Sequence, residues 1–212
     1  LSLIIFTLSR ILPGNPARQA LGPTASDQQV QELSRQMGLH KPVYQQYVDF
    51  LIGLITGDLG MSLESRNPVL QDILRYLPAT LELITVAMLI TVIIGVPLGT
   101  ISAKNKDGLV DNSTRLFAFF AVSVPNFFVA ILLQLIFGTF LEWLPQTGRI
   151  SLQYQSEVTR ETGFLLIDTL LAGSLGAHVN VWLHLVLPAL ALAISPMGQV
   201  IRITRSSMID EL

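Results

Sequence analysis

The stretch that decides the fold is residues 83–103, LITVAMLITVIIGVPLGTISA, which contain no charged side chain. A helix needs about 20 predominantly apolar residues to cross the hydrocarbon core of a bilayer, and this stretch is long enough. Two more uncharged runs follow it, at residues 116–141 and 183–201. Because backbone N–H and C=O groups in lipid have to bond within their own segment, each run predicts a membrane-spanning helix.

The composition of the whole chain agrees with a lipid environment. Apolar residues make up 50% of the 212 residues and charged residues 13%, against about 25% charged in a typical soluble domain. The net charge of −2 gives no indication of nucleic-acid binding. The chain has no cysteine, which excludes disulfides, zinc–thiolate sites and a cysteine nucleophile. We therefore predict an all-α fold, a polytopic transmembrane helical bundle.

The apolar runs and the segments between them predict an order of parts with four spans. The opening run, LSLIIFTLS, has no basic region before it and no cleavage site after it, so we interpret it as the second half of a span rather than a signal peptide. The expected order is a truncated first span at 1–12, an extracytoplasmic helical segment at 13–78, a second span at 79–103, a cytoplasmic loop at 104–115, a third span at 116–141, an extracytoplasmic loop with an interfacial helix at 142–182, a fourth span at 183–201 and the start of a cytoplasmic loop at 202–212.

Basic residues predict which side of the membrane each connection faces. Lys and Arg concentrate in cytoplasmic loops, whereas acidic residues contribute little to orientation. The two connections that we place in the cytoplasm contain, between them, Lys104, Lys106, Arg115, Arg202 and Arg205. Trp143 and Trp182 would then lie at the outer interface, where indole rings anchor a protein in the membrane.

The segment 13–78 has the start and stop signals of helices. Ser26 and Gln29 form a capping box that predicts a helix ending near Gly38. Pro42 and Gly57 bound a second predicted helix, and a third short helix is expected at 68–77. We interpret the mixed charges of this segment as a solvated face; a docking surface for an extracytoplasmic partner is the alternative.

No catalytic, cofactor-binding or metal-binding motif is visible. The chain lacks the GxxxxGK[ST] phosphate loop, and its three histidines are not at metal-ligand spacing. We therefore expect no catalytic residue, no cofactor and no metal site in this chain.

The side chains inside the predicted spans are neutral. We assign no Asp, Glu, Lys, Arg or His to the span interiors, whereas carriers coupled to protons or sodium usually hold an ionisable residue at membrane depth. An external energy source is therefore favoured. Neutral polar residues usually hydrogen-bond between helices, but some could line a hydrophilic route, and Ser123, Asn126 and Gln134 are the candidates. Gly95 and Gly99 form a GxxxG pair of the kind that permits close helix contact.

Four prolines lie inside the apolar runs. We expect them to kink the spans, since neighbouring helices and hydroxyl groups can satisfy the freed carbonyls. The alternative is that they bend the helices around a central pathway. The four are Pro97, Pro125, Pro188 and Pro196.

Nine motifs in order carry a family resemblance. They are RILPGNPA from Arg10, MGLHKPVYQQYVDFL from Met37, GDLGMSLESRNPV from Gly57, RYLPATLEL from Arg75, IGVPLGTISA from Ile94, SVPNFFVAILL from Ser123, LPQTGR from Leu144, HLVLPALALA from His184 and RITRSSM from Arg202. The set closely resembles the first permease subunit of the dipeptide, oligopeptide and nickel ABC importers, over nearly the whole chain.

The resemblance implies a prokaryotic cytoplasmic-membrane protein with six spans in its complete form. It implies three kinds of partner: a second homologous permease subunit, two cytoplasmic ATPase subunits and an extracytoplasmic solute-binding protein. The segment 13–78 would lie beneath the binding protein, with Tyr44 and Tyr47 as candidate contacts. The family's ATPase-docking loop would follow RITRSSM, beyond Leu212. The substrate could be a dipeptide, a longer peptide, a nickel chelate or glutathione, with a peptide expected.

Two other functions remain open. An ion-independent secondary transporter or a channel subunit would also be a multi-span helical protein. Uptake that depends on ATP and on partner subunits would distinguish the importer from both.

Overall fold

A computed structural model describes residues 3–4, 6–7, 15–62 and 64–211, and the regular elements of these residues are all helices. The chain divides into two compact units, Leu1–Tyr76 and Leu77–Leu212. Most of the predicted first span, 1–12, lies outside the described residues.

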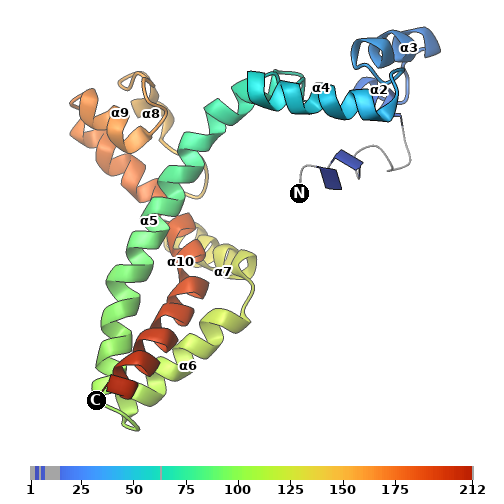
Figure 1. The fold of residues 1–212 in the computed structure, drawn as a ribbon. Helices are drawn as coiled ribbons and strands as arrows, with labels where there is room; N and C mark the ends of the chain where they lie inside the picture. Colours follow the sequence, from blue (N-terminus) through green and yellow to red (C-terminus); the bar gives the residue numbers. More distant parts are fainter. Residues whose placement is uncertain (1–2, 5, 8–14, 63, 212) are drawn as a thin grey trace. The chain divides into compact units, whose positions relative to one another are not determined.

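The described helices follow one another along the chain in the order labelled in Figure 1. They are α2 (Pro16–Leu21), α3 (Asp27–Gln36), α4 (Val43–Thr56), α5 (Val69–Lys104), α6 (Leu109–Ser123), α7 (Asn126–Leu133), the π-helical η1 (Gln134–Phe140), α8 (Leu152–Gln155), α9 (Leu165–Leu171) and α10 (Leu175–Glu211).

The first unit confirms the helix signals read from its sequence. The capping box is present at α3: the Ser26 hydroxyl accepts a hydrogen bond from Gln29 N at 3.3 Å, and Gln29 Oε1 accepts one from Ser26 N at 3.0 Å. Helix α4 begins directly after Pro42 and ends at Gly57, whose φ of 80° is in the left-handed region that glycine adopts at no steric cost.

Helix α5 is longer than the predicted second span. It runs without interruption from Val69, so the prediction of a separate helix at 68–77 is wrong. Pro78 removes one backbone donor, but the helix continues through it. The Pro78 ring lies against Gly163, where a Cβ would come within 3.0 Å of it. With 36 residues at about 1.5 Å each, α5 is about 54 Å long, more than the roughly 30 Å hydrocarbon core.

The third apolar run is not one straight helix. Helix α6 begins within the predicted cytoplasmic loop and ends at Ser123, and α7 with η1 continues at 105° to it. The break lies at Pro125, because proline pushes the residue before it into an extended conformation, and Val124 has ψ of 129°. The other three prolines of the apolar runs lie inside continuous helices.

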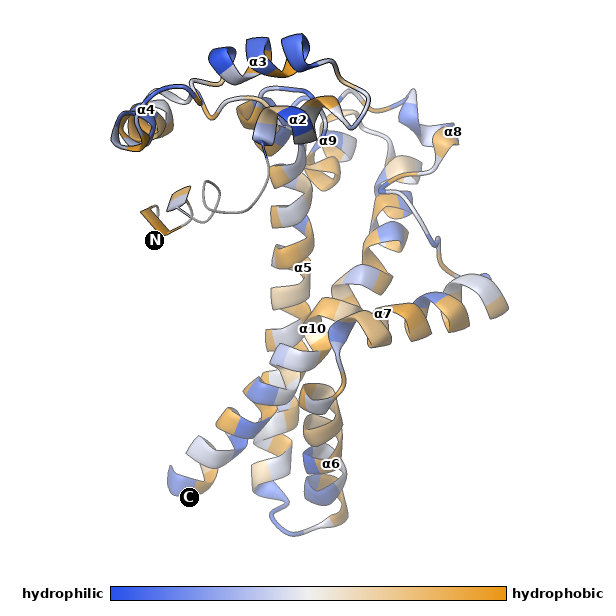
Figure 2. Cartoon of the chain, turned by 90° about the vertical axis from the view of Figure 1, so that its right-hand side faces the viewer, coloured by the Kyte–Doolittle hydropathy of each residue, from blue (hydrophilic) through white to orange (hydrophobic). Residues whose placement is uncertain are grey.

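By length and composition, α5 and α10 can each cross a membrane, and the bent pair of α6 with α7–η1 is a third candidate if it forms one span. In Figure 2, apolar residues dominate the middle of these helices. The middle of α5 exposes large apolar side chains, as lipid contact requires; among them are Met88, Leu89, Val92 and Ile93.

Helices α5, α6 and α10 run side by side in the second unit (Figures 1 and 2). The close contact predicted at Gly99 is present: a Cβ there would lie 2.7 Å from Thr204 Cβ. Gly198 of α10 makes the matching approach to α6, where a Cβ would lie 2.9 Å from Ala118 O. Small residues on both sides thus let three backbones approach closely, which is how helices gain packing energy in lipid.

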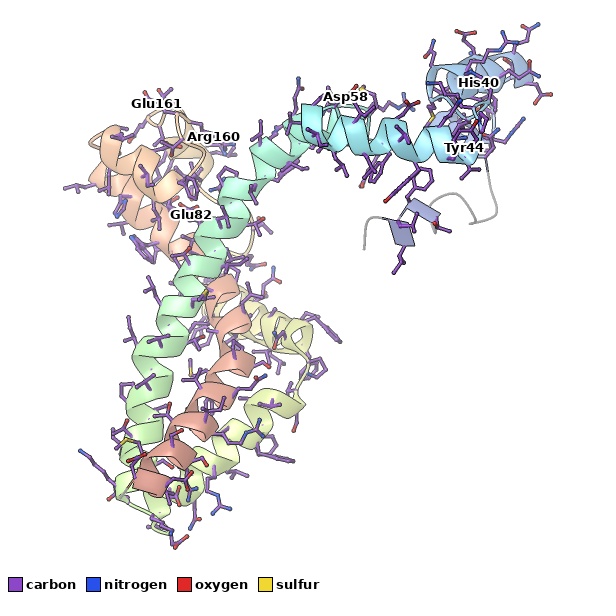
Figure 3. The ribbon with its side chains drawn as sticks, viewed as in Figure 1. His40, Tyr44, Asp58, Glu82, Arg160 and Glu161 are labelled. Atoms are coloured by element: carbon purple, nitrogen blue, oxygen red, sulfur yellow. The ribbon has the colours of Figure 1, made fainter. Side chains whose placement is uncertain are left out.

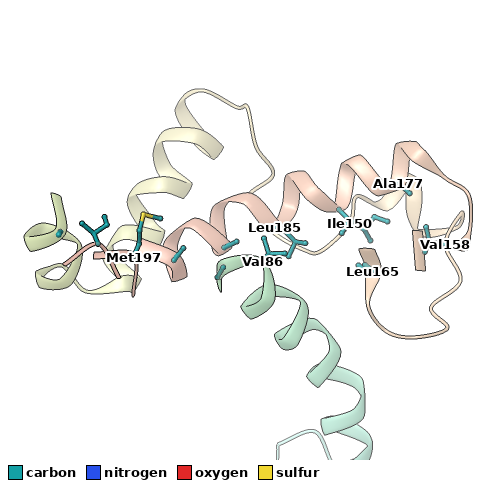
Figure 4. Packing of buried hydrophobic residues seen from close by; sticks show 13 residues of the cluster. Val86, Ile150, Val158, Leu165, Ala177, Leu185 and Met197 are labelled. Carbon is teal, nitrogen blue, oxygen red and sulfur yellow. The ribbon is translucent and has the colours of Figure 1, made fainter. Parts of the chain in front are cut away.

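A chain of buried apolar side chains follows α10 through this unit (Figure 4). Leu165 of α9, Ala189 and Ala193 are fully buried. Thr91 of α5 is buried too, and its hydroxyl donates to Ala193 O of α10 at 3.3 Å as well as to Ala87 O of its own helix at 2.9 Å. This neutral side chain joins helices, as most polar residues in spans were expected to do.

An ion pair with a buried carboxylate joins α5 to the segment between η1 and α10. Arg149 Nη2 donates to Glu82 Oε2 at 2.7 Å and to Gly163 O at 3.1 Å, while Leu166 N donates to Glu82 Oε1 at 2.7 Å. The Glu82 side chain is 3% exposed and lies on the side of α5 that faces this segment (Figure 3). The Glu82 carboxylate therefore binds both the loop that contains Arg149 and the first turn of α9.

The prediction that the span interiors contain no ionisable side chain is wrong. Glu82 and His184 lie within the predicted spans 79–103 and 183–201, and both are buried, so those spans are not free of ionisable residues. Asp168 of α9 is buried as well, at 1% exposed. Its carboxylate accepts hydrogen bonds from Thr162 N at 2.9 Å and Gly163 N at 3.1 Å and so closes the preceding turn.

Arg149→Gln should destabilise the protein by about 3 kcal/mol, because it leaves the Glu82 carboxylate buried without its cation. The measurement is the unfolding temperature of the purified protein in detergent. Arg160→Gln is the matched control, since Arg160 is exposed in the same segment. Equal unfolding temperatures for the two variants would show that Arg149 does not stabilise the buried Glu82 carboxylate.

Candidate functional site

The three candidate pathway residues lie around the break between α6 and α7–η1. Ser123 is the last residue of α6, Asn126 the first of α7 and Gln134 the first of η1. The structure does not bring them into one cavity: Ser123 and Gln134 line different hollows, and Asn126 is exposed at the start of its helix.

Gln134 lines a small cavity of about 260 Å³ between η1, the following loop and α10. Gln134 Nε2 donates to Gln146 O at 3.1 Å, and Gln146 Nε2 donates back to Gly138 O at 2.8 Å. Gly138 is required for this exchange, since a Cβ there would lie 2.6 Å from Gln146 Cγ. π-Helical turns recur at functional sites, and this one places two amide side chains beside a hollow.

His184 lies on the α10 side of the same cavity. Its Nδ1 is 2.8 Å from Asn180 O, which can only accept, so Nδ1 carries a proton. In the neutral ring Nε2 is then an acceptor. The wall of the cavity thus contains two amide side chains and an imidazole, which can hydrogen-bond to a polar solute.

Ser123 lines a larger open groove of about 740 Å³ between α6 and α10. Its hydroxyl donates to Phe119 O of its own helix at 2.8 Å. The groove has apolar walls and a basic end that contains Arg115 and Arg202, both exposed.

The two tyrosines proposed as partner contacts have different surroundings within the first unit. Tyr44 is 68% exposed at the start of α4 (Figure 3). Tyr47 is half-buried, and its ring lies 5.2 Å from Phe6 and 6.4 Å from Phe50, measured between centroids. Tyr44 is therefore available to a partner, whereas Tyr47 contributes mainly to an aromatic cluster.

The group of hydrogen bonds around the Asp111 carboxylate, where α5, α6 and α10 meet, was not predicted from the sequence. Asp111, fully buried, accepts hydrogen bonds from Arg205 Nε at 2.5 Å and Nη2 at 2.7 Å, from Ser102 Oγ at 2.6 Å and from Asp107 N at 3.0 Å. From the sequence, Arg205 was used only as a basic residue of a cytoplasmic connection, and no role was assigned to Asp111. No spacing pattern could have paired them, because 94 residues separate them.

The described polar groups are not arranged as a metal centre. Among the described residues, no three His, Asp or Glu side chains are grouped so that they could hold a metal ion. The polar groups of this unit instead hold helices together or face hollows with neutral hydrogen-bonding atoms.

Comparison with known proteins shows which family this chain belongs to. The sequence profile of the binding-protein-dependent transport system inner membrane component matches residues 95–212, and the N-terminal profile of the same kind of membrane component matches residues 1–84. Both units of the chain are therefore covered.

Individual relatives match along nearly the whole chain. A dipeptide transport system permease protein of Alkalihalophilus pseudofirmus is 37% identical over 212 residues, which are 100% of this chain and 63% of the relative. A probable D,D-dipeptide transport system permease protein of Escherichia coli is 38% identical over 99% of this chain and 62% of its own length. A glutathione transport system permease protein of Pectobacterium atrosepticum is 32% identical over 99% of this chain and 59% of its own length.

The chain thus spans about three fifths of the length of these relatives. The two profiles, the relatives and the apolar helices lead to one conclusion: this chain is a multi-pass inner-membrane protein and belongs to the family of binding-protein-dependent transport system inner membrane components.

Proposed function

We propose that this chain is the permease subunit of an ATP-driven importer and forms half of a translocation pathway for peptides. The observation that carries the proposal is that relatives matching the chain from end to end are named permease proteins of dipeptide transport systems. The chain is not itself an enzyme, and ATP is hydrolysed by separate subunits.

The proposed complex has three further kinds of component. They are a second homologous permease subunit, two cytoplasmic ATPase subunits and an extracytoplasmic solute-binding protein. Membership of a binding-protein-dependent transport family supports the last two kinds. The pathway would lie between the two permease subunits, which would alternate between outward and inward access as ATP is bound and hydrolysed.

The neutral cavity at Gln134 supports a peptide as the solute. A peptide presents amide N–H and C=O groups, which Gln146 and His184 can match with single hydrogen bonds. Neutral partners hold such a solute weakly, so it can leave again, whereas a buried charge would bind one peptide terminus tightly. Ser123 and Asn126 remain candidates for other parts of the same route.

The energy source provides the first test. Membrane vesicles that contain the complete complex should take up a dipeptide when ATP and the binding protein are supplied, and should not respond to a proton gradient alone. Uptake that follows the gradient without ATP would indicate a secondary transporter, and uptake that needs neither energy source would indicate a channel.

Tyr44→Asp should weaken the docking of the binding protein without reducing membrane insertion, because it adds a charge to an exposed aromatic contact. We expect a loss of roughly tenfold in docking affinity, about 1.4 kcal/mol, measured by surface-immobilised binding. Gln45→Asp adds the same charge at the neighbouring exposed position of α4. Unchanged docking in Tyr44→Asp, or equal losses in both variants, would exclude Tyr44 as a specific contact.

A further inference from the structure

Asp111 is the meeting point of three helices. Its carboxylate joins Ser102 near the end of α5, the connector at Asp107, its own helix α6 and Arg205 of α10. The Asp111 side chain is 0% exposed and that of Arg205 is 20% exposed. A carboxylate removed from water to this extent needs a cation and several donors to remain charged, and here both are present.

The bond between Asp111 and Arg205 is directional as well as strong. Arg205 uses Nε and Nη2 on the two carboxylate oxygens, at 2.5 and 2.7 Å. Two parallel hydrogen bonds from a planar guanidinium fix both distance and orientation, which a lysine could not do. The pair therefore sets how far α10 is rotated and how far it is shifted along its axis at this end.

The packing just before Arg205 leaves α10 little freedom to slide. At Gly99 a Cβ would lie 2.8 Å from Ile201 O, and at Gly198 a Cβ would lie 2.9 Å from Ala121 Cβ. These close approaches allow only one register of α10 relative to α5 and α6. A shift of α10 by one residue would place a side chain where only a glycine hydrogen now fits.

The opposite end of α10 is also attached to other parts of the same unit. Asn180 Oδ1 accepts from Ser151 N at 2.8 Å, and Asn180 Nδ2 donates to Ser151 Oγ at 3.0 Å. Helix α10 is continuous from Leu175 to Glu211. A movement applied near Arg205 would thus reach the segment at Ser151 through one helix, provided that α10 stays aligned with its neighbours.

We propose that Asp111 and Arg205 are positioning residues for transport: their bidentate pair, completed by Ser102, makes α5, α6 and α10 move as one body when ATP hydrolysis drives the importer. This inference rests on the proposed function. Without the pair, α10 can shift without α5 and α6, so that ATP is hydrolysed while the three helices no longer move together. Arg205 also lines the groove beside Ser123, but in this proposal the pair acts through the helices that it aligns.

The test compares solute uptake with ATP hydrolysis in the complete reconstituted complex. The double variant Asp111→Asn with Arg205→Gln removes both charges together, so that neither is left buried alone. Arg205→Lys keeps the positive charge but removes the bidentate hydrogen bond to Asp111. In both variants we expect the number of dipeptides imported per ATP hydrolysed to fall roughly tenfold, a typical size for coupling between sites.

A second double variant is the matched control. Glu82→Gln with Arg149→Gln removes the other buried pair on α5, with the same number and signs of charges, and should leave the ratio of uptake to hydrolysis unchanged. If the ratio is also unchanged in both Asp111–Arg205 variants, so that uptake and hydrolysis fall only with the amount of assembled complex, the pair is merely structural and the inference is wrong.

The same experiment separates this inference from the proposed function. If the unmodified complex shows no ATP-dependent dipeptide uptake, the proposed function itself fails, and the inference fails with it. If the unmodified complex transports and the control double variant loses coupling as strongly as the Asp111–Arg205 variants, then loss of any buried pair explains the result and the inference is contradicted.

Discussion

A buried carboxylate must keep a cation and hydrogen-bond donors beside it, and this constraint shapes the second unit more than any other interaction. Asp111 and Glu82 are both shielded from water, and each is paired with an arginine from a distant part of the chain. Removing one partner of such a pair costs about 3–5 kcal/mol, because the other charge is left behind. Each pair therefore permits one arrangement of the segments that meet there.

Lipid makes these polar contacts more decisive than they would be in water. Apolar surfaces gain little by moving from lipid to a helix interface, so close packing and hydrogen bonds have to hold the helices together. The glycine contacts at Gly99 and Gly198 supply the close packing, and Thr91 supplies a hydrogen bond between α5 and α10. The result is a well-defined group of three helices, beside which the neutral cavity at Gln134 can keep its shape.

Local signals in the sequence were sufficient for some elements and not for others. The capping box at Ser26 and the stop at Gly57 were predicted correctly, because capping depends on residues within one or two turns. The uncharged run at 83–103 placed the middle of α5 but not its start, since the preceding residues also favour a helix. Proline was ambiguous: Pro97 lies inside a helix and Pro125 ends one, and their neighbours in the fold decide which occurs.

The candidate site was harder to predict than the helices. Gln134 was selected as a neutral polar residue within a span, which is a local property. Its partner Gln146 and the pairing of Asp111 with Arg205 depend on contacts between segments far apart in the chain. A single sequence has no periodicity that records such contacts. Glu82 lies directly before the uncharged run at 83–103, and no local signal in the sequence indicates that it is buried or paired with Arg149.

The central claim is that the second unit crosses the membrane with the Asp111 cluster at its cytoplasmic end and the Glu82 pair toward the outside. Since the chain has no cysteine, Lys106→Cys and Arg160→Cys can be labelled one at a time with a membrane-impermeant maleimide. In intact right-side-out vesicles, the cysteine at position 160 should react and the one at 106 should react only after permeabilisation. Reaction at position 106 from the outside would contradict this orientation and the role proposed for the Asp111–Arg205 pair.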